Sequence, residues 1–338
     1  MEMMEDVVIV GAGIAGLATA VALKRVGVRA LVLREIARDT SHSYDPLFKG
    51  SVTNINTGDV QQVLFSEQGI RPVHRKALLE ALAEELPTDT IRFSSKLAAI
   101  ESQEQGGGAS IAVVHLEDGT AIKSKVLIGC DGVNSIGSST VVRTGRASPL
   151  RAISGENMTG EPEQIQREVL EKYAENFPSI YLDVVRHADL STISWAPLMF
   201  RHPWRIIFGN LNKGNITVAG DAMHPMTPEL GQGGGSSLED AVVLGRHIGN
   251  SIIKNGGQFV EGDMAKAIDD YVKERRSRAA LLVTGSYLSG WIQHGGAKWW
   301  ERFFRDRLFF KYIFGFLAGL AHYNCGNLPA ASSSGKED

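Results

Sequence analysis

Three groups of glycine residues could form turns that bind a phosphate-containing ligand. They lie at residues 11–16, 106–108 and 231–235. A turn of glycines lets backbone N–H groups approach phosphate oxygens that side chains would otherwise keep away. Glycine makes up 37 of the 338 residues, about 11% against a usual ~7%. The group at 106–108 follows polar residues and predicts a flexible hairpin tip or loop. The other two groups are therefore the candidates for binding a phosphate-containing ligand.

The first group matches the pattern G-x-G-x-x-G. Its sequence is Gly11-Ala12-Gly13-Ile14-Ala15-Gly16, and it stands between an apolar run at 7–10 and a helical pattern over 17–23. In such a turn the first glycine permits the tight turn, the second lets the backbone approach a pyrophosphate, and the third lets helix and strand pack closely. The helix then presents free N–H groups and the positive end of its dipole to the phosphates.

An acidic residue follows this turn at the distance that a dinucleotide site requires. A second apolar run, 30–33, ends in Arg34-Glu35, and Glu35 lies 19 residues beyond Gly16. An acid at this place accepts hydrogen bonds from ribose hydroxyls and disfavours a 2′-phosphate. The pattern therefore predicts a site for NAD or FAD rather than NADP, and a glycine turn without a ligand is the alternative.

Two later strands also end in an aspartate beside a glycine. The apolar run 126–129 leads into Asp131-Gly132, and the run 215–219 leads into Gly220-Asp221. Either aspartate alone is more often a turn or N-cap residue. Because ligands bind beyond the carboxyl ends of parallel strands, two such ends together with the N-terminal motif favour one shared ligand site.

The third glycine group opens a helix. Residues 228–235 are Pro-Glu-Leu-Gly-Gln-Gly-Gly-Gly, and an apolar helical pattern continues beyond Asp240. The spacing of Ser236 and Glu239 matches S-x-x-E and predicts a capping box. An exposed helix N-terminus suits an anion, or negative charge that develops during a reaction.

Taken in this order, the motifs resemble those of the FAD-dependent aromatic hydroxylases, the class A flavoprotein monooxygenases. The resemblance rests on the turn at 11–16, on Asp131-Gly132, and on Gly220-Asp221-Ala-Met-His224-Pro225 followed by Gly-Gln-Gly at 231–233. The stretches 218–228 and 238–245 look especially similar to plant monooxygenases related to salicylate hydroxylase and zeaxanthin epoxidase. The similarity covers most of residues 5–150 and 165–325.

The resemblance implies FAD as cofactor and NAD(P)H as co-substrate. It places the pyrophosphate at 11–16, the adenosine ribose at Glu35, an FAD contact at Arg75, the ribityl and pyrophosphate region at Asp221, and the flavin ring near 231–233. Asp131-Gly132 matches a motif associated with both FAD and NAD(P)H. The full set of expected cofactor-binding residues is Gly11, Ala12, Gly13, Ile14, Ala15, Gly16, Glu35, Arg75, Asp131, Gly132, Asp221, Pro228, Gly231, Gln232, Gly233 and Gly234.

The chemistry implied by the resemblance is a monooxygenation. NAD(P)H reduces FAD, the reduced flavin adds O2 to form a C4a-hydroperoxide, and one oxygen atom passes to a small aromatic or isoprenoid substrate, so the cofactor carries the difficult step. The expected partners are this small molecule and O2. No catalytic side chain is assigned and no metal site is expected. His224, beside the inferred flavin, is interpreted as a structural histidine that bonds backbone, and a proton-relay role is the alternative.

The fold expected is α/β, with a Rossmann-like FAD/NAD(P)-binding domain, a reduced antiparallel-sheet substrate domain and a C-terminal helical segment. The boundaries predicted are 1–140 and 214–290 for the FAD-binding domain, 141–213 for the substrate domain, 291–330 for the helical tail and 331–338 for a disordered end.

The sequence departs from the family where the substrate pocket is expected. Residues 36–50 are polar and irregular, and 143–162 are rich in Gly, Ser and Thr. A helix is predicted over 163–176, and only Tyr181–Val185 and 192–198 suggest further sheet or packing elements. Ile136-Gly-Ser138 also stands where the family often has an arginine. The hypothesis is therefore a preserved FAD half with a shortened substrate half, and with activity reduced or lost.

Composition narrows the classes of protein further. The net charge of −3 gives no field that would recruit nucleic acid, and two cysteines exclude a disulfide framework. The acidic residues at 1–6 argue against a secretory signal, so a cytoplasmic location is expected. The aromatic and basic stretch 298–320 is interpreted as packing over the FAD domain, with a weak contact to a membrane surface as the alternative. Oligomeric state is not predicted.

Two other functions stay open from the residues alone. An NAD-dependent dehydrogenase would use only the N-terminal motif, and the later Gly-Asp turn and glycine-opened helix argue against it. A non-catalytic or weakly active FAD-binding relic would keep the nucleotide-binding fold, and the shortened substrate segment favours that interpretation.

Overall fold

The computed structural model describes residues 3–35, 49–53, 60–64, 73–105, 109–133, 135, 148–149, 161–174, 177–193, 198–294, 303 and 322–330. The chain divides into two compact units. The first consists of 1–40, 75–148 and 199–338, and the second of 41–74 and 149–198. The domain boundaries expected from the sequence stay a prediction.

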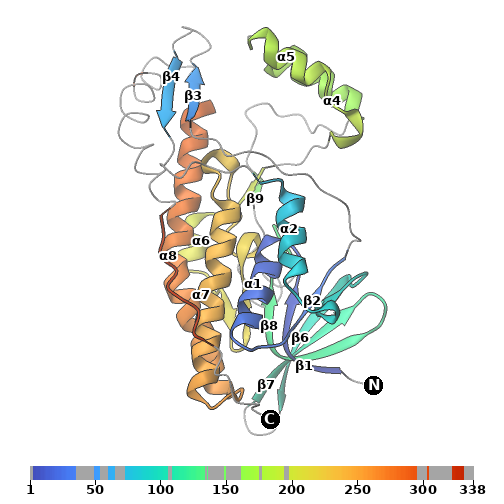
Figure 1. The fold of residues 1–338 in the computed structure, drawn as a ribbon, viewed down its shortest axis with the longest axis vertical. Helices are drawn as coiled ribbons and strands as arrows, with labels where there is room; N and C mark the ends of the chain where they lie inside the picture. The colour runs from blue at the N-terminus through green and yellow to red at the C-terminus, as the bar shows by residue number, and fades with distance from the viewer. Residues whose placement is uncertain are drawn as a thin grey trace, which may run out of the picture. The chain divides into compact units, whose positions relative to one another are not determined.

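The first unit contains a mixed sheet whose parallel strands stand in the order β12-β8-β1-β2-β5 (Figure 1). The bounds of these strands are β1 (Met3–Val10), β2 (Ala30–Leu33), β5 (Ile91–Arg92), β8 (Ala121–Gly129) and β12 (Ile216–Val218). Residues 7–10, 30–33 and 126–129 are all buried. Continuous apolar runs of this kind are expected where a parallel strand is covered on both faces.

Three antiparallel strands extend this sheet. β11 (Asn212–Lys213) pairs with β12, and a hairpin of β6 (Leu97–Gln105) and β7 (Ala109–Leu116) pairs with the first half of β8. The hairpin register closes on Gln105 and Ala109, so the hairpin is as predicted. Its three glycines, 106–108, lie outside the described residues.

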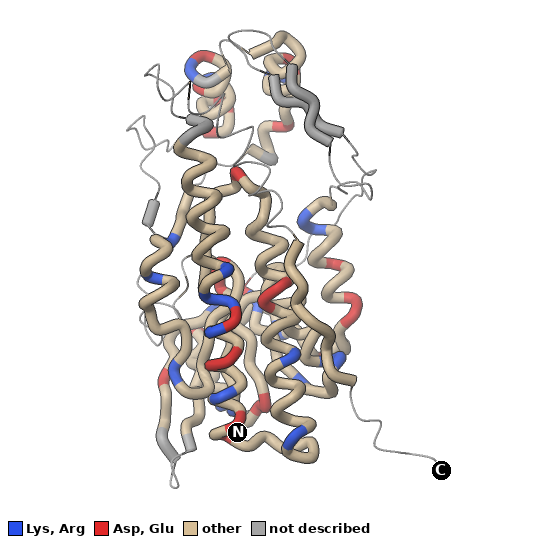
Figure 2. Tube along the Cα trace, turned by 90° about the vertical axis from the view of Figure 1, so that its left-hand side faces the viewer, with Lys and Arg blue, Asp and Glu red and all other residues tan. Residues whose placement is uncertain are grey.

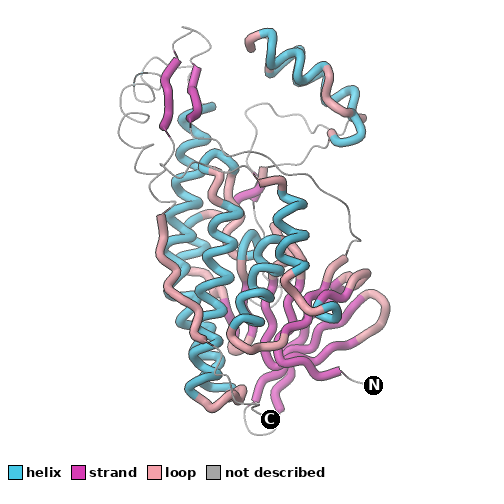
Figure 3. Tube along the Cα trace, viewed as in Figure 1, coloured by secondary structure: helices cyan, strands magenta, loops and turns pink. Residues whose placement is uncertain are grey.

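Helices α1 (Ile14–Arg25), α7 (Gly233–Lys254) and α8 (Glu261–His294) lie side by side next to the sheet (Figure 3). The shorter elements of this unit are α2 (Arg75–Glu84), α6 (Pro203–Ile207), and the 3-10 turns η1 (Thr88–Thr90), η4 (Gly220–Ala222) and η5 (Pro228–Leu230). Acidic and basic residues are interspersed along the described chain, as the small net charge suggests (Figure 2).

The second unit contains a hairpin and several short helices. Its elements are β3 (Lys49–Thr53), β4 (Val60–Leu64), α4 (Pro162–Glu168), the π-helical turn η2 (Val169–Tyr173), α5 (Ser179–Arg186) and the 3-10 turn η3 (Leu190–Thr192). The helix predicted over 163–176 is confirmed over 163–173, as α4 and η2, and residues 175–176 lie outside the described residues. Two-residue strands, β9 (Ser148–Pro149) and β10 (Met199–Phe200), stand where the chain passes between the units.

Of the sheet or packing element suggested at Tyr181–Val185, the sheet is wrong, because these residues belong to helix α5. Pro178 is the N-cap of that helix, and Phe177, Ile180, Tyr181 and Val184 recur at helical spacing along one face. A short apolar run does not distinguish a strand from a helix by itself. The second predicted element, 192–198, begins at the last residue of η3 and mostly falls outside the described residues.

The described part of the C-terminal tail predicted as helical over 291–330 is only partly helical. Residues 291–294 belong to α8 and Phe303 is helical, whereas residues 322–330 have no regular secondary structure. Apart from Phe303, the stretch 298–320 lies outside the described residues, so the two interpretations of its aromatic side chains stay open. Within the described chain, no helix has the length and apolar character needed to span a membrane.

Candidate functional site

The three sequence motifs and Glu35 follow strands that end at the same edge of the sheet. Val10 is in register with Leu33 on one side and with Gly129 on the other, and Gly129 is in register with Val218. The residues that come next are therefore neighbours in space. Backbone bonds continue past the strands, since Gly11 N–H donates to the Leu33 carbonyl at 3.0 Å and Ala219 N–H donates to the Gly129 carbonyl at 2.9 Å.

The glycines of the first motif each meet a different constraint. A Cβ atom on Gly11, whose φ is +107°, would lie 2.3 Å from the carbonyl oxygen of Cys130. A Cβ on Gly16 would lie 1.9 Å from the carbonyl oxygen of Gly11. A Cβ on Gly13 would meet no atom within 4 Å. The first and third glycines thus serve close packing, whereas Gly13 faces open space that a ligand can enter.

The start of helix α1 has the properties of an anion-binding site. Gly13 is the N-cap and supplies no side-chain hydrogen bond to the helix. The first intrahelical bond runs from Leu17 N–H to the Gly13 carbonyl at 3.0 Å, so the N–H groups of Ile14, Ala15 and Gly16 precede the helical ladder. Such groups and the helix dipole favour a phosphate. A backbone cradle beside open space therefore fits the pyrophosphate of a dinucleotide.

The Gly220-Asp221 motif, which we call the late motif, packs directly on the turn at 11–16. We call residues 220–224, which begin with this motif, the late turn. Gly220 has a φ of +61°, and a Cβ there would lie 2.6 Å from Ala15 Cβ and 3.1 Å from Ser237 Oγ. A Cβ on Gly234 would lie 3.6 Å from Ile14 Cδ1. The N-termini of α1 and α7 therefore converge around Gly220, although about 220 residues separate these helices in sequence.

The remaining predicted residues lie at or near this edge. Asp131 and Gly132 follow β8 and are half-buried, and Gly132 has a φ of +80°. Asp221 is exposed in η4, and Glu35 is exposed two residues beyond β2. Arg75 is the exposed first residue of α2, and among the helices it is α1 that α2 mainly contacts.

The segment before α7 forms a tight turn of its own. Pro228 begins η5, Gly231 follows it in the left-handed region with a φ of +62°, and Gln232 is the N-cap of α7 without a side-chain bond to the helix. The predicted capping box is therefore wrong. α7 begins at Gly233, three residues before Ser236, and both side chains of the expected box bind elsewhere.

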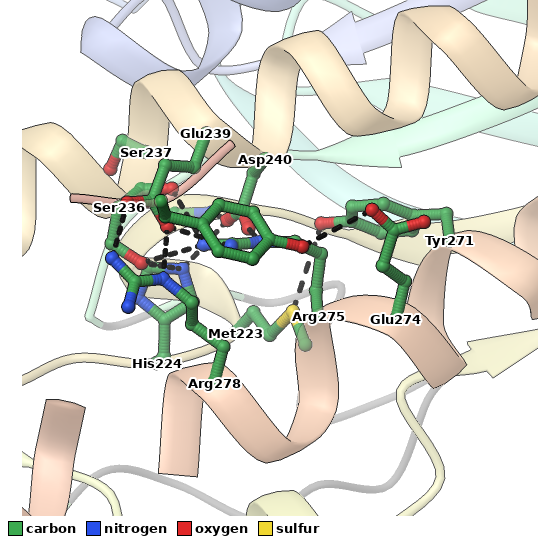
Figure 4. Close-up of polar contacts among 12 residues, drawn as sticks. Met223, His224, Ser236, Ser237, Glu239, Asp240, Tyr271, Glu274, Arg275 and Arg278 are labelled. Atoms are coloured by element: carbon green, nitrogen blue, oxygen red, sulfur yellow. Dashed lines mark hydrogen bonds and ion pairs between the residues drawn. The ribbon is translucent and has the colours of Figure 1, made fainter. Parts of the chain in front are cut away.

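A fully buried carboxylate connects the late turn to helices α7 and α8 (Figure 4). Asp240 Oδ2 accepts hydrogen bonds from Gly220 N–H at 2.8 Å and from His224 Nε2 at 2.6 Å. Its other oxygen accepts from Arg275 Nε at 2.7 Å. His224 is thus a buried histidine that binds a carboxylate through Nε2, whereas the expectation was a backbone partner.

Arg275 extends this contact into a larger cluster of charged groups. It donates to Glu239 Oε2 at 2.7 Å, to the Ser236 carbonyl at 3.2 Å and to Ser236 Oγ at 3.0 Å. Arg278 donates to both oxygens of Glu239, at 2.8 and 2.6 Å. Beneath the cluster, the hydroxyl of Tyr271 donates to the Val218 carbonyl at 3.1 Å. We call Glu239, Asp240, Arg275 and Arg278 the ion cluster.

The environment shifts several pKa values in this region. Burial alone would raise the pKa of the Asp240 carboxyl, but the charges of His224 and Arg275 and their hydrogen bonds lower it to about 2. For Arg275, burial opposes the charge, yet the pairing with Asp240 and Glu239 raises its pKa above the ordinary value. Burial, followed by the charge of Asp131, raises the pKa of the Cys130 thiol well above its usual range. Asp240 is therefore a carboxylate at neutral pH.

Sequence reasoning did not find the ion cluster. Arg275 lies 35 residues beyond Asp240, in a helix whose charged residues look like a solvated face. The signal that could have found it is the close spacing of Arg275, Arg276 and Arg278 in a helix otherwise carrying buried apolar positions, since buried arginine needs an acidic partner. In the described part of the chain, no three His, Cys, Asp or Glu side chains gather as a metal site would require.

The chain is similar to known FAD-dependent proteins over most of its length. A family profile described as "FAD binding domain" matches residues 4–75 and 166–286. "Monooxygenase 2" of Arabidopsis thaliana is 34% identical over 404 aligned positions, which cover 96% of this chain and 98% of that protein. "Monooxygenase 1" of the same plant is 31% identical, over 85% of this chain and 91% of that protein.

More distant relatives are also similar to this chain over most of its length, and solved structures share its fold. "FAD-dependent urate hydroxylase" of Mycolicibacterium vanbaalenii is 24% identical, over 82% of this chain and 86% of that protein. The crystal structure of HpxO from Klebsiella pneumoniae, complexed with FAD and uric acid, superposes with a TM-score of 0.72 at 19% identity, over 94% of this chain and 96% of that one. FqzB superposes with a TM-score of 0.67 at 16% identity, over 96% and 98% of the two chains. The chain belongs to the class A FAD-dependent monooxygenases.

Proposed function

We propose that this protein uses NAD(P)H and O2 to insert one oxygen atom into a small aromatic or isoprenoid substrate. The family membership supplies FAD as the cofactor. When bound, FAD would accept electrons from NAD(P)H and activate O2 for transfer to the substrate. The observation that carries the proposal is the convergence of the starts of α1 and α7 around Gly220, at the edge where β1, β2, β8 and β12 end.

Different residues at this edge would bind different parts of FAD. The N–H groups of Gly13 to Gly16 would bind the pyrophosphate, because Gly13 leaves space and the helix start carries unpaired donors. The exposed carboxylates Glu35 and Asp221 would accept hydrogen bonds from hydroxyl groups of the ribose and ribityl chains. Asp131-Gly132 and Arg75 would make further contacts with the cofactor.

The start of α7 would face the flavin ring. Gln232 to Gly234 offer backbone N–H groups and no side chain beyond that of Gln232, whereas the N–H of Gly231 already donates to the Pro228 carbonyl. The helix dipole favours negative charge at this end. A reduced flavin carries such charge, so this end of α7 would stabilise the reduced form. The residues at the sheet edge would thus bind and orient the cofactor. The substrate half would exclude water from it.

An aromatic substrate is supported by the names of related enzymes. The relatives include "FAD-dependent urate hydroxylase", "6-methylsalicylate 1-monooxygenase atA" of Aspergillus terreus and "6-hydroxynicotinate 3-monooxygenase" of Bordetella bronchiseptica. Each name contains a ring compound, but identities near 24% do not transfer a particular substrate. A panel of hydroxylated aromatic acids and heteroaromatic rings is therefore the first choice for assays.

A weakly active FAD-binding relic is the second candidate. Because 96% of 338 residues is about 324, about 80 of the 404 positions aligned with "Monooxygenase 2" hold no residue of this chain. A shortened substrate half would explain this difference, in line with the sparse sheet-forming sequence at 141–213. An NAD-dependent dehydrogenase is disfavoured, because the late motif joins the N-terminal motif at one edge and the family uses FAD.

The test is the absorbance spectrum of the purified protein, followed by turnover assays with labelled O2. A yellow protein that oxidises NAD(P)H and places one labelled oxygen atom in a substrate supports the proposal. A yellow protein that oxidises NAD(P)H without oxygenating any aromatic or isoprenoid compound favours the relic. A colourless protein that FAD cannot reconstitute contradicts both.

A further inference from the structure

The Asp240–Arg275 pair joins the two segments proposed to face FAD. Asp240 holds the N–H of Gly220, which begins the turn that carries Asp221, and Arg275 holds the carbonyl and hydroxyl of Ser236 in the first turns of α7. Both side chains are fully buried. The pair is therefore bonded to the backbone of the late turn on one side and to that of the α7 start on the other, and it ties both to α8 (Figure 4).

From these contacts we infer that the Asp240–Arg275 pair is a positioning element for bound flavin, which fixes the late turn and the start of α7 and balances the buried charge beside them. The inference rests on the proposed function, in which these two segments hold the flavin half of FAD. Asp240 and Arg275 act through backbone groups of other residues, so they are positioning residues rather than catalytic ones.

Geometry supports the positioning part of the inference. The turn at Gly220 is closely packed, because its φ is +61° and an added Cβ there would lie 2.6 Å from Ala15 Cβ. A shift of the turn would also lose the hydrogen bond from Gly220 N–H to Asp240. His224, four residues later, binds the same Asp240 oxygen. One carboxylate thus fixes both ends of the turn. A shift of about 1 Å in groups that orient a reactant can reduce a rate about a hundredfold.

Charge supports the second part. The ion cluster holds two carboxylates and two guanidinium groups at or near full burial, where fields are weakly screened. Removing Asp240 leaves an excess of positive charge next to the α7 start, and removing Arg275 leaves an excess of negative charge. Since reduction adds negative charge to flavin, the first change should favour the reduced form and the second should oppose it.

The C-terminal segment closes the cluster on its outer side. The ring of Tyr323 lies 5.2 Å from the Arg275 guanidinium carbon and 4.6 Å from that of Arg278. The Tyr323 hydroxyl donates to Glu274 Oε1 at 3.2 Å. An aromatic face on two guanidinium groups shields them from water, so the cluster keeps its charges in a region of low dielectric.

The experiment compares variants of opposite charge in the full-length protein. Asp240→Asn and Arg275→Gln each remove one charge while keeping a polar side chain of similar size. Asp270→Asn, at a partly exposed position of α8, removes ion pairs with Lys266 and Lys273 that lie outside the cluster, and it serves as the control. The measurements are the dissociation constant of FAD, by quenching of flavin fluorescence, and the midpoint reduction potential of the bound flavin.

We expect both cluster variants to bind FAD roughly 5- to 100-fold more weakly than the wild type, the range of coupling between linked sites. The reduction potential should rise in Asp240→Asn and fall in Arg275→Gln, and Asp270→Asn should change neither quantity. A merely structural role would move both potentials in the same direction or not at all. Arg275→Lys, which keeps the charge but loses the planar fork, should weaken FAD binding and retain a potential near that of the wild type.

A second variant, Glu239→Gln, tests the same charge effect as Asp240→Asn. If Asp240→Asn fails to fold, Glu239→Gln also removes a negative charge from the cluster and should raise the potential. The inference alone would be overturned if the wild type binds FAD but the reduction potentials of the two cluster variants shift in the same direction. It would also be overturned if the cluster variants bind FAD as tightly as the control. A wild type that binds no FAD would overturn the proposed function as well.

Discussion

Gly11 and Gly13 belong to one hexapeptide, but the structure gives them separable tasks. A Cβ on Gly11 would collide with the Cys130 carbonyl at 2.3 Å, at a φ of +107° that side chains rarely adopt. Gly11→Ala should therefore destabilise the apoprotein by about 1–3 kcal/mol. Gly13→Ala meets open space, so it should cost at most about 1 kcal/mol at the N-cap, yet it should weaken FAD binding.

Thermal unfolding of the apoprotein and FAD titration together check this contrast. Gly262→Ala, at the start of α8 with no atom within 4 Å of the added Cβ, is the matched control and should change neither quantity. If Gly13→Ala bound FAD as tightly as the control, the assignment of this turn to the pyrophosphate would be wrong.

Asp240 should give the protein a distinct sensitivity to acid. Its folded-state pKa of about 2 lies below the ordinary value of 3.8, so its contribution is fully present above about pH 4 and is lost as the pH falls through 2. A shift of this size corresponds to about 2 kcal/mol of stability. Urea unfolding between pH 5 and pH 2 should show that Asp240→Asn loses less stability than the wild type over this range. Equal losses would mean that Asp240 is not held as a carboxylate.

Single residues were predictable from sequence where a local motif carried the information. The turn at 11–16 and the aspartates at 131 and 221 lie at one sheet edge, as their positions after strands indicate. Their contacts with FAD stay predictions. Arg275 had no such motif, because its partners are distant in sequence and only the packing of α8 on α7 brings them together. Ser236 was misread for the same reason, since its hydroxyl binds Arg275 instead of capping the helix.

At the scale of elements, two glycines of α7 set how closely that helix packs. A Cβ on Gly245 would lie 2.8 Å from Ala22 Cβ, and one on Gly249 would lie 2.9 Å from Val26 Cβ and from Pro329 Cγ. Residues 322–330 and the end of α1 therefore meet α7 where it lacks side chains. This close approach keeps the starts of α1 and α7 together at the proposed FAD site.

Substitution at this crossing should destabilise the protein without touching the site. Gly249→Val inserts three carbon atoms into a closed contact, and overpacking of this kind typically costs about 1–3 kcal/mol. Differential scanning calorimetry should show a lower melting temperature than in Gly262→Ala, which adds a side chain in open space. An unchanged melting temperature would show that α1 and α7 are not packed as closely as described.

Helices and strands were predictable from the sequence where the apolar pattern was long. Their prediction failed where the pattern was short. The strands at 7–10, 30–33, 126–129 and 216–218 and the helix that follows the third glycine group correspond to continuous apolar runs or sustained helical spacing. Tyr181–Val185 is a five-residue, mostly apolar segment that suits either state, and it lies in a helix that begins directly after Pro178. The residues that determine how much sheet lies in the second unit fall largely outside the described part of the chain.

At the scale of the whole molecule, the protein combines glycine and Gly-Asp motifs at one sheet edge with a chain shorter than "Monooxygenase 2" over their alignment. About 80 positions of the alignment with "Monooxygenase 2" hold no residue here. A monooxygenase needs its substrate half to exclude water, because an unprotected site releases activated oxygen without using it. A shortened substrate half should therefore lower the coupling between cofactor oxidation and substrate oxygenation.

The coupling ratio gives the prediction at this scale. We expect a substantial share of the NAD(P)H consumed to appear as hydrogen peroxide, measured by a peroxidase assay, even with a ring substrate present. "Monooxygenase 2" of Arabidopsis thaliana, purified in the same way, is the reference. Equal peroxide yields in the two proteins would contradict the idea that the substrate half of this chain is compromised.

The most direct test of FAD binding at this edge is the ratio of FAD to protein in the purified wild type and in Gly13→Ala. We expect a flavin spectrum with about one FAD per chain in the wild type, and loss of most of that FAD in the variant, because a side chain at Gly13 would enter the open space proposed for the pyrophosphate. A wild-type protein that neither carries FAD nor takes it up on reconstitution would contradict this assignment.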